Sequence, residues 1–474
     1  MLCWPKPAHR LRNAPVSRSQ RFGGPLSRIF GAAVLFFSLL LPSCLIAPAQ
    51  GGEVRSRGRT GAQCLGPADL PNWLQIENDD ADWLCGDRRP ERPREYDIGV
   101  VAAGIEECYP GDEPPVSGEH IWISPQGDDT NSGESPASAL RTLKSVLCRV
   151  APGQTVHLLP GVYREAVALG GAGNADSATI RIRGEGADPT AVVLDGEYWR
   201  SFAIGLVESF HISIENLTVQ HYTDAGIYSL GGGDVSLVGV VSRYNGRCNV
   251  DPDSEGEGFG VNLVGTGDIR VEGSRFEHNG PLLAPVLCGD VLGTGINTFE
   301  ASGVIRGNTI RHTRGGGILV EKSTGPFLVE DNVVEKNDLL APDNYWDGGI
   351  WIDESVDVTV GKNRFSDNWG GAGIQISDEE GAYPRSSKQI TVTGNTLTGN
   401  FAGVLIWGYG VCPPPGDVIT NWESLLQDNR VAENRFDGKD YPIRCDPEFV
   451  GGEVPAPRVG RGFLHLPWIR FAAD

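Results

Sequence analysis

"DVTVGKNRFSDNWG", from Asp357 to Gly370, is the stretch of sequence that decides the fold. Apolar residues alternate with polar ones, a tight turn with an asparagine follows, and a second short alternation begins. Alternation with a period of two indicates a strand, because successive side chains of a strand point to opposite faces. Asn363 falls in the turn, where asparagine tolerates left-handed backbone geometry. The stretch therefore predicts two short strands joined by a tight turn.

The same pattern returns in copies that begin at Asp268, Ser302, Pro326 and Gln389. Each copy has small polar residues at two fixed positions. The first position holds Ser274, Asn308, Asn332, Asn363, Asn395 and Asn434, and the second holds Asn245, Asn279, Thr313, Asn337, Asn368 and Asn400. If the copies stack, these side chains become neighbours and can hydrogen-bond along the stack.

A further short strand, opening with Gly-Ile or Gly-Val, follows most copies. Its glycines are Gly226, Gly260, Gly295, Gly317, Gly349, Gly373 and Gly403. A unit this small cannot bury its own apolar face, whereas a stack of units can. We therefore predict an all-β fold, a single-stranded right-handed parallel β-helix of about 9–11 coils.

The ends of such a stack expose strand edges that need covering. The segment from Ser138 to Val150 carries apolar residues at helical spacing, which predicts a short amphipathic helix that caps the first coil. The rest of the chain divides by composition and periodicity. We expect an export signal over residues 1–49, an irregular disulfide-stapled extension over 50–118, the β-helix over 119–445 and a tail over 446–474.

The first 49 residues have the features of an export signal. Basic residues precede an apolar run from Ile29 to Leu41, and a small-residue cleavage pattern ends at Ala49. The run is short for a membrane span, so we predict no transmembrane helix. Cleavage after Ala49 gives a secreted, periplasmic or extracellular protein, whereas the "LPSC" ending at Cys44 would give a lipoprotein anchored through that cysteine.

Cysteines in an exported chain are expected to form disulfides. No Cys-x-x-Cys pair or zinc-like spacing is present, and the number of cysteines beyond the leader is even. We expect local pairs: Cys64 with Cys85, Cys108 with Cys148, Cys248 with Cys288, and Cys412 with Cys445.

The formal net charge is −21, and the leader contributes only basic residues, so the exported part is more acidic still. Phosphate binding needs a basic face, so nucleic acid is excluded as a partner. We expect a monomer whose partner is a polysaccharide or oligosaccharide.

The segment from Ile121 to Glu165 joins a strand, a Gly-Asp-rich turn, the predicted capping helix and "PGQTVHLLPGVY". Together with the repeats, it resembles the secreted right-handed parallel β-helix proteins of the polysaccharide lyase type, the pectate-lyase-like superfamily. The resemblance covers the chain from Ile121 to Phe436 and implies the scaffold and a carbohydrate substrate. The residue motifs of polygalacturonases and mannuronan epimerases are absent from the sequence.

Several of the Gly-Ile strands end in acidic residues, which suggests a site. Adjacent coils of a parallel stack lie about 4.8 Å apart, so Glu321 and Asp353 should be neighbours, with Asp378 on the next coil. Carboxylates this close either share a proton or bind a cation. The alternative is that they are solvated turn residues.

Aromatic residues flank the same coils. Tyr345, Trp346, Trp351 and Trp407 are candidate platforms for sugar rings, although tryptophans also pack beneath loops. His278 and His312 occupy matching positions of adjacent coils, and we expect them to form a stacked structural ladder.

Three functions remain open at this point. The first is cation-assisted β-elimination on an acidic polysaccharide, with Lys322 as the base and calcium as the cofactor. The calcium ligands would be Asp347, Asp353, Glu354 and Asp378. The second is a glycoside hydrolase that uses Glu321 and Asp353 as its carboxylate pair. The third is a non-catalytic carbohydrate-binding or cell-surface protein.

Overall fold

The structure is a computed structural model, and it describes residues 106–108, 114, 116–174, 176–246, 258–280, 293–323, 325–338, 348–368, 372–377, 387–400, 402–407, 430–436 and 444–446. Of residues 106–108, 402, 407, 436 and 444–446, only the backbone is described. The chain divides into two compact units at Cys64, and every described residue belongs to the second. The predicted signal with Cys44, most of the 50–118 extension and nearly all of the tail lie outside the described residues.

The described residues form three parallel sheets, A, B and C, of 11, 11 and 10 strands. Sheet A contains β1 (Glu106–Cys108), β5 (Val167–Gly170), β8 (Ile204–Val207), β11 (Ala225–Leu230), β14 (Phe259–Val264), β17 (Ile296–Phe299), β20 (Ile318–Glu321), β23 (Ile350–Asp353), β26 (Ala372–Ser377), β29 (Ala402–Trp407) and β32 (Arg444–Asp446). Sheet B contains β2 (His120–Ile123), β3 (Thr155–Leu158), β6 (Ile180–Gly184), β9 (Phe210–Glu215), β12 (Gly233–Val238), β15 (Ile269–Glu272), β18 (Gly303–Arg306), β21 (Phe327–Glu330), β24 (Val358–Gly361), β27 (Thr391–Thr393) and β30 (Arg430–Ala432). Sheet C contains β4 (Gly161–Tyr163), β7 (Val192–Asp195), β10 (Thr218–Gln220), β13 (Val241–Arg243), β16 (Arg275–Glu277), β19 (Thr309–Arg311), β22 (Val333–Glu335), β25 (Arg364–Ser366), β28 (Thr396–Thr398) and β31 (Arg435–Phe436).

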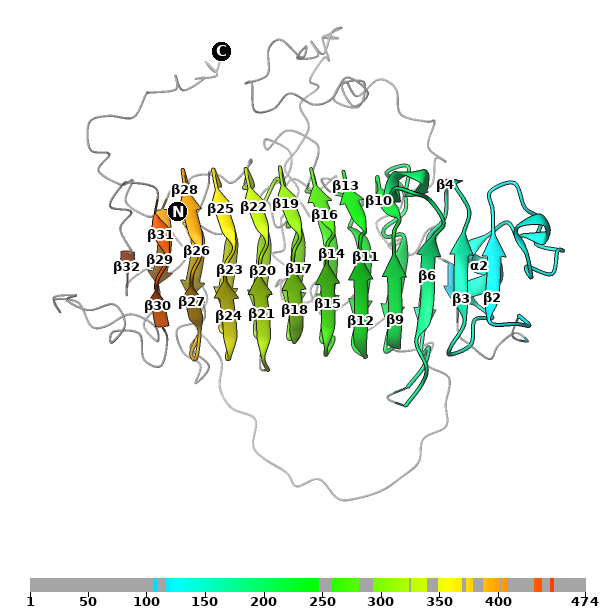
Figure 1. The fold of residues 1–474 in the computed structure, drawn as a ribbon, viewed down its shortest axis with the longest axis horizontal. Helices are drawn as coiled ribbons and strands as arrows, with labels where there is room; N and C mark the ends of the chain where they lie inside the picture. The colour runs from blue at the N-terminus through cyan, green and yellow to red at the C-terminus, as the bar shows by residue number, and fades with distance from the viewer. Residues whose placement is uncertain are drawn as a thin grey trace, which may run out of the picture. The chain divides into compact units, whose positions relative to one another are not determined.

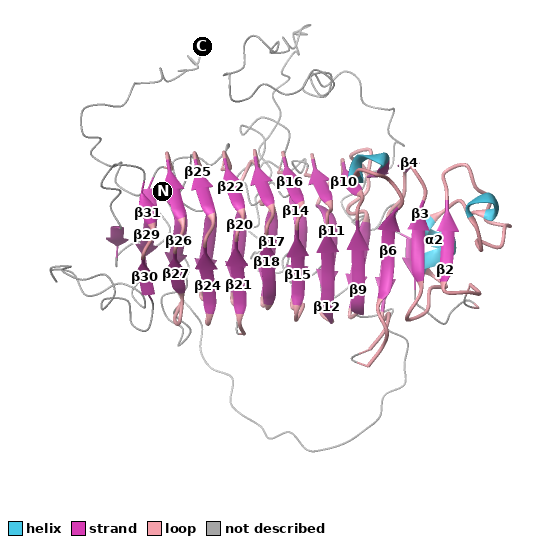
Figure 2. Ribbon diagram, in the orientation of Figure 1, coloured by secondary structure: helices cyan, strands magenta, loops and turns pink. Residues whose placement is uncertain are grey.

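From β3 onward each coil contributes one strand to each sheet, and the coils follow one another in chain order, while β1 and β2 extend sheets A and B at the N-terminal end (Figure 1). The predicted Gly-Ile and Gly-Val strands all lie in sheet A, and the two strands of each repeat lie in sheets B and C. Strand and turn dominate the described part of the chain, with short helices only near its N-terminal end (Figure 2). The prediction of a parallel β-helix is confirmed.

Stacked aliphatic side chains fill the inside of the coils. Ile318, Ile350 and Ile374 pair in register in sheet A, and each is at most 1% exposed. Burying side chains of this size contributes about 1.5–3 kcal/mol each. The core therefore runs along the stack, and each coil completes the core of its neighbours.

The two predicted polar ladders are both present. At the turn from sheet B to sheet C, the side-chain oxygen of Asn363 accepts hydrogen bonds from the backbone N–H and the amide of Asn332, both at 2.9 Å. Asn363 in turn donates to Asn395. After sheet C, Asn337, Asn368 and Asn400 repeat the arrangement. These contacts fix the register of consecutive coils.

A third ladder lies at the turn from sheet A to sheet B, and the sequence analysis did not predict it. The backbone N–H of Ser323 donates to the hydroxyl of Ser355 at 3.0 Å, and the backbone N–H of Ser355 donates to Ser387 at 3.2 Å. All three serines are at most 1% exposed. The stacking buries the polar groups of these turns, and hydrogen bonds between adjacent coils give them partners.

The capping helix is present but shorter than predicted. It is α2 (Leu143–Leu147), it packs against β1, β2 and β5, and its Leu143, Val146 and Leu147 are fully buried. The prediction of a helix from Ser138 was wrong at its N-terminal end. The carboxylate of Asp129 accepts the backbone N–H groups of Arg141 and Thr142 at 2.8 and 2.9 Å, so the chain stays extended there and the helix begins after Thr142.

Two further observations concern the predicted extension and disulfides. Strand β1 lies within the 50–118 segment, and its backbone pairs with β5. Cys148, at the end of α2, is disulfide-bonded, while its predicted pairing with Cys108 stays a prediction. In the part of the chain that the structure describes, no helix is long and apolar enough to span a membrane.

We predict that Asn363→Leu lowers the free energy of unfolding by about 2–4 kcal/mol, because the buried backbone N–H and side-chain amide of Asn332 lose the oxygen that accepts them. Urea unfolding followed by circular dichroism measures the change. The exposed Arg270 provides the control, since Arg270→Gln should change stability by less than about 0.5 kcal/mol. Equal losses for the two variants would show that the ladder contributes no stability.

Candidate functional site

The predicted acidic strand ends are brought together. Glu321 pairs in register with Asp353, and Asp353 pairs with Ser377 on the next coil of sheet A. The register expected from the sequence is therefore present at this end of the sheet. Asp378 lies outside the described residues.

Lys322 forms ion pairs with two of these acids. Its ammonium lies 3.3 Å from the carboxylate of Glu321 and 3.7 Å from that of Glu354. The same ammonium lies 5.2 Å from the ring centroid of Phe299. These are the contacts of a charged lysine, whereas the predicted role as a base requires a neutral amine.

Asp353 and its neighbours are enclosed. Asp353, Glu354 and Trp351 are 1%, 2% and 7% exposed. The hydroxyl of Ser377 donates to Asp353, and the indole N–H of Trp351 donates to that hydroxyl at 2.6 Å. Trp351 therefore packs within the fold, and the carboxylate of Asp353 is engaged in a buried network.

The remaining predicted residues are not tested by the structure. Tyr345, Trp346 and Asp347 lie outside the described residues, and of Trp407 only the backbone is described. Within the described ranges, no group of three or more His, Cys, Asp or Glu residues is placed to hold a metal ion. The calcium site and the aromatic platform stay predictions.

The residue that follows each of these strands has a recurring backbone geometry. Glu300, Lys322 and Glu354, each the first residue after a strand of sheet A, have φ of +50°, +53° and +45°. Gly231 and Gly265, at the equivalent positions of earlier coils, have φ of +67° and +60°. The position is thus a left-handed turn residue that recurs from coil to coil, and sequence alternation alone does not show this.

We predict that Glu300→Gly raises the free energy of unfolding by about 0.5–1 kcal/mol, because glycine relieves a left-handed conformation that costs other residues about 1–2 kcal/mol. Thermal or urea unfolding measures it. Glu272→Gly, the same substitution within strand β15, should instead destabilise by about 1 kcal/mol. A lower free energy of unfolding in the Glu300 variant would contradict this prediction, because the contacts of the Glu300 side chain would then contribute more than the relief of the turn.

A second group of candidate side chains lies where the chain leaves sheet C. Rings stack there from coil to coil, with centroid distances of 4.8 Å for Tyr198 and His221, 6.1 Å for His221 and Tyr244, 4.9 Å for Tyr244 and His278, and 4.8 Å for His278 and His312. The predicted stacking of His278 on His312 is confirmed. The structure adds that it continues a longer aromatic column, which we call the Tyr–His ladder (Tyr198, His221, Tyr244, His278 and His312).

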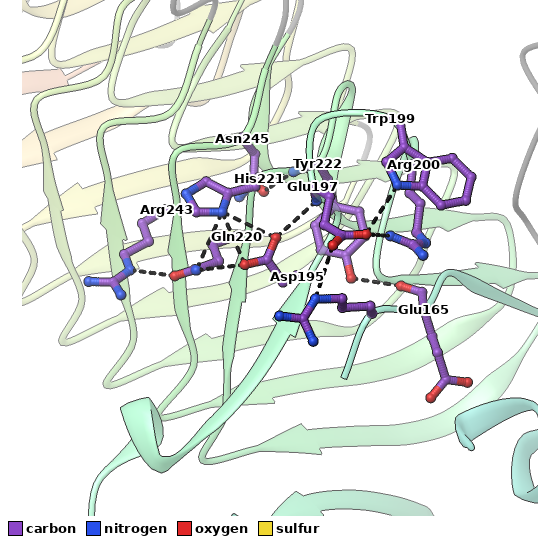
Figure 3. A network of polar contacts seen from close by, with 11 residues as sticks. Glu165, Asp195, Glu197, Trp199, Arg200, Gln220, His221, Tyr222, Arg243 and Asn245 are labelled. Atoms are coloured by element: carbon purple, nitrogen blue, oxygen red, sulfur yellow. Dashed lines mark hydrogen bonds and ion pairs between the residues drawn. The ribbon is translucent and has the colours of Figure 1, made fainter. Parts of the chain in front are cut away.

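At the first coils of this ladder, the charged side chains satisfy one another (Figure 3). Glu197 lies 2.9 Å from Arg200 and 3.0 Å from Arg164, so both guanidinium groups have an anionic partner. Arg243 donates to the side-chain oxygen of Gln220 at 3.0 Å, and Gln220 donates to Asp195 at 3.0 Å. Each arginine and carboxylate of this network therefore has a hydrogen-bond or ion-pair partner.

Arg314, further along the ladder, differs. It is 7% exposed, its Nε has no hydrogen-bond partner, and no carboxylate among the described residues forms an ion pair with it. Burial lowers the pKa of its guanidinium from the ordinary value, while Tyr198 and Tyr244 nearby oppose the shift. A buried cation without an anion is costly, so this is a candidate site for an anionic ligand.

The backbone makes room for this arginine. A Cβ added at Gly280, on the preceding coil, would lie 2.5 Å from the Cβ of Arg314, so the side chain needs glycine beneath it. Gly280 also has φ of +104°. The sequence analysis missed this site. Its signal was present in the aligned copies, where "HNG" ending at Gly280 is followed one coil later by "HTR" ending at Arg314.

His278 lies close to this guanidinium and is neutral at ordinary pH. Burial, followed by the charges of His312, Arg314, Arg311 and Arg243, lowers its pKa to about 3. The site therefore combines a fixed cation with an uncharged imidazole and with phenol side chains.

We predict that His278 makes the protein less stable in acid. The unfolded imidazole binds a proton below its ordinary pKa of 6.5, and the folded one only below about 3, so the free energy of unfolding falls as the pH decreases between these values. His278→Phe keeps a stacked ring and should remove about 3 kcal/mol of the loss between about pH 7 and pH 4. Urea unfolding of both proteins across this range measures the difference; identical slopes would contradict the shift.

Comparison with known proteins supports the fold. The family model for a right-handed beta helix region matches residues 180–345 and 341–413. The uncharacterized protein YwoF of Bacillus subtilis (strain 168) is 27% identical over 332 residues, 62% of this chain. The alignment spans 65% of that relative's length.

Solved structures of similar architecture include the pectate lyase Pel9A, at 14% identity and a TM-score of 0.47, covering 69% of this chain and 80% of that one. The GH136 lacto-N-biosidase of Eubacterium ramulus has 13% identity and a TM-score of 0.42, with 69% and 67% covered. The alginate lyase of Paenibacillus sp. str. FPU-7 has 16% identity and a TM-score of 0.40, with 65% and 95% covered. Likenesses this distant do not assign a substrate or a mechanism. The strand topology and the family match together identify residues 180–413 as a right-handed β-helix region, the architecture that the repeats predict.

Proposed function

We propose that this protein acts on an acidic polysaccharide and cleaves it by β-elimination, with Arg314 binding the carboxylate of a uronate residue. The observation that carries the proposal is the buried guanidinium of Arg314, which has no anionic partner within the described structure. A guanidinium presents paired N–H donors that match a carboxylate, and the pairing is stronger away from water.

The chemistry of β-elimination fits this environment. A base removes the ring proton next to the uronate carboxylate, a carbon–carbon double bond forms, and the bond to the leaving sugar oxygen breaks as that oxygen takes a proton. Binding of the carboxylate to a cation stabilises the negative charge that develops there. Tyr244, which stacks on His278 near Arg314, is a side-chain type that accepts and donates protons.

The calcium-assisted form of the same reaction receives less support from the described residues. Of the predicted ligands, Asp353 accepts the hydroxyl of Ser377, and Glu354 is ion-paired with Lys322. Arg314 supplies a positive charge without a metal, so the proposal uses the guanidinium in that role. Export of the chain, as the leader indicates, would bring such an enzyme to extracellular polysaccharides.

The test is an assay on galacturonate, mannuronate–guluronate and glucuronate polysaccharides, followed by the ultraviolet absorbance of the unsaturated product. We expect product with at least one of them. Reducing ends without that absorbance would indicate hydrolysis instead, and binding without any product would indicate a non-catalytic module.

Arg314→Met should lower the rate of elimination at least about 100-fold, because the carboxylate loses its cation. The same change should leave the melting temperature unchanged or higher, since an apolar side chain of similar length replaces an unpaired buried charge. Arg306→Gln is the control, because Arg306 is half exposed on sheet B and paired with Glu330. Retained activity in the Arg314 variant would refute the assignment.

A further inference from the structure

Two more polar side chains, on the coil before the one that Arg314 leads into, are buried without full hydrogen bonding. Thr294 is 2% exposed, and its hydroxyl has no partner among the described residues. Asn297 is 9% exposed; its amide nitrogen donates to Asn262 at 2.9 Å, but its oxygen accepts nothing. Buried polar atoms in folded proteins are nearly always paired, so each of these is exceptional.

Their backbone segment runs next to that of Arg314. Thr294 immediately precedes β17, and Asn297 is the second residue of that strand. The carbonyl of Gly293 accepts the backbone N–H of Gly315 at 2.8 Å, so the segment with Thr294 runs alongside the segment with Arg314. The polar atoms of Thr294, Asn297 and Arg314 thus belong to two hydrogen-bonded neighbouring segments where the chain enters sheet A.

Asn297 lies on the outer side of sheet A. Its strand neighbours Ile296 and Thr298 are at most 1% exposed and face the core, and alternation turns Asn297 to the other side. It pairs in register with Asn262 on one coil and Leu319 on the next. The buried amide oxygen of Asn297 thus belongs to the outer side of the sheet, at the register position next to Leu319.

We propose that Thr294 and Asn297 form a subsite that recognises the hydroxyl groups of the sugar whose carboxylate Arg314 binds. This inference rests on the proposed function, and it names the groups that determine which sugar is bound. A sugar hydroxyl donates to the oxygen of Asn297, and a second hydroxyl exchanges a hydrogen bond with Thr294. Sites that leave buried polar groups unpaired without the correct ligand discriminate strongly against analogues that lack those hydroxyls.

The experiment compares Thr294→Val and Asn297→Leu, which keep size and remove the polar group. Binding of trisaccharides of galacturonate, mannuronate and glucuronate is measured by calorimetry, together with melting temperatures without ligand. We expect each variant to bind about tenfold more weakly. We also expect unchanged or higher melting temperatures, because an unsatisfied buried polar atom has been removed. Thr359→Val, in strand β24 of sheet B, is the matched control and should bind as the wild type does.

The outcomes separate this inference from the function on which it rests. Wild-type protein that binds none of the trisaccharides refutes the proposed function and the subsite with it. Binding that is lost with Arg314→Met but unchanged with Thr294→Val and Asn297→Leu refutes the subsite alone, and shows that these atoms are merely hydrated. A lowered melting temperature in both variants would make the residues structural and would equally overturn the subsite.

Discussion

The in-register stacking of coils by side chain to backbone hydrogen bonds is the constraint on which the rest of the structure depends. Asn332, Asn363 and Asn395 each join the turn of one coil to the turn of the next, and they are at most 1% exposed. Parallel strands alone would tolerate a slip along the sheet, but a slip here would leave buried amides unpaired. Register is therefore fixed at every coil, and any outward-facing column of side chains becomes a defined surface.

Left-handed turn residues set what those columns contain. His278 and His312, with φ of +55° and +56°, repeat the turn geometry that Glu300 and Lys322 show at the end of sheet A. Because the turn repeats, its side chains leave the coil in the same direction and stack on one another. The Tyr–His ladder and the charged residues that follow the strands of sheet A, such as Glu300 and Lys322, share this backbone feature, and a charge or ring at such a position is not by itself a functional sign.

What distinguishes a site from these repeating columns is incomplete pairing. Around Glu197, the arginines and carboxylates neutralise one another, whereas Arg314 has no anion among the described residues. A fold that leaves a cation, a hydroxyl and an amide oxygen unpaired in neighbouring segments loses stability there. Natural proteins retain unpaired buried groups where a ligand supplies the missing partner. Stability is then lower in exchange for function, as it is at active sites.

The sequence by itself determined the scaffold: the periodic strands, both asparagine ladders, the stacking of His278 on His312, and the neighbour relation of Glu321 and Asp353. These follow from local alternation and from the identity of equivalent positions, which any stack in register preserves. Only the tertiary structure decided that Asp353 is buried and that Arg314 lies over Gly280 without a partner. Burial and hydrogen-bond pairing depend on which segments pack together in space. A pattern along the chain does not show which buried polar atoms lack a partner.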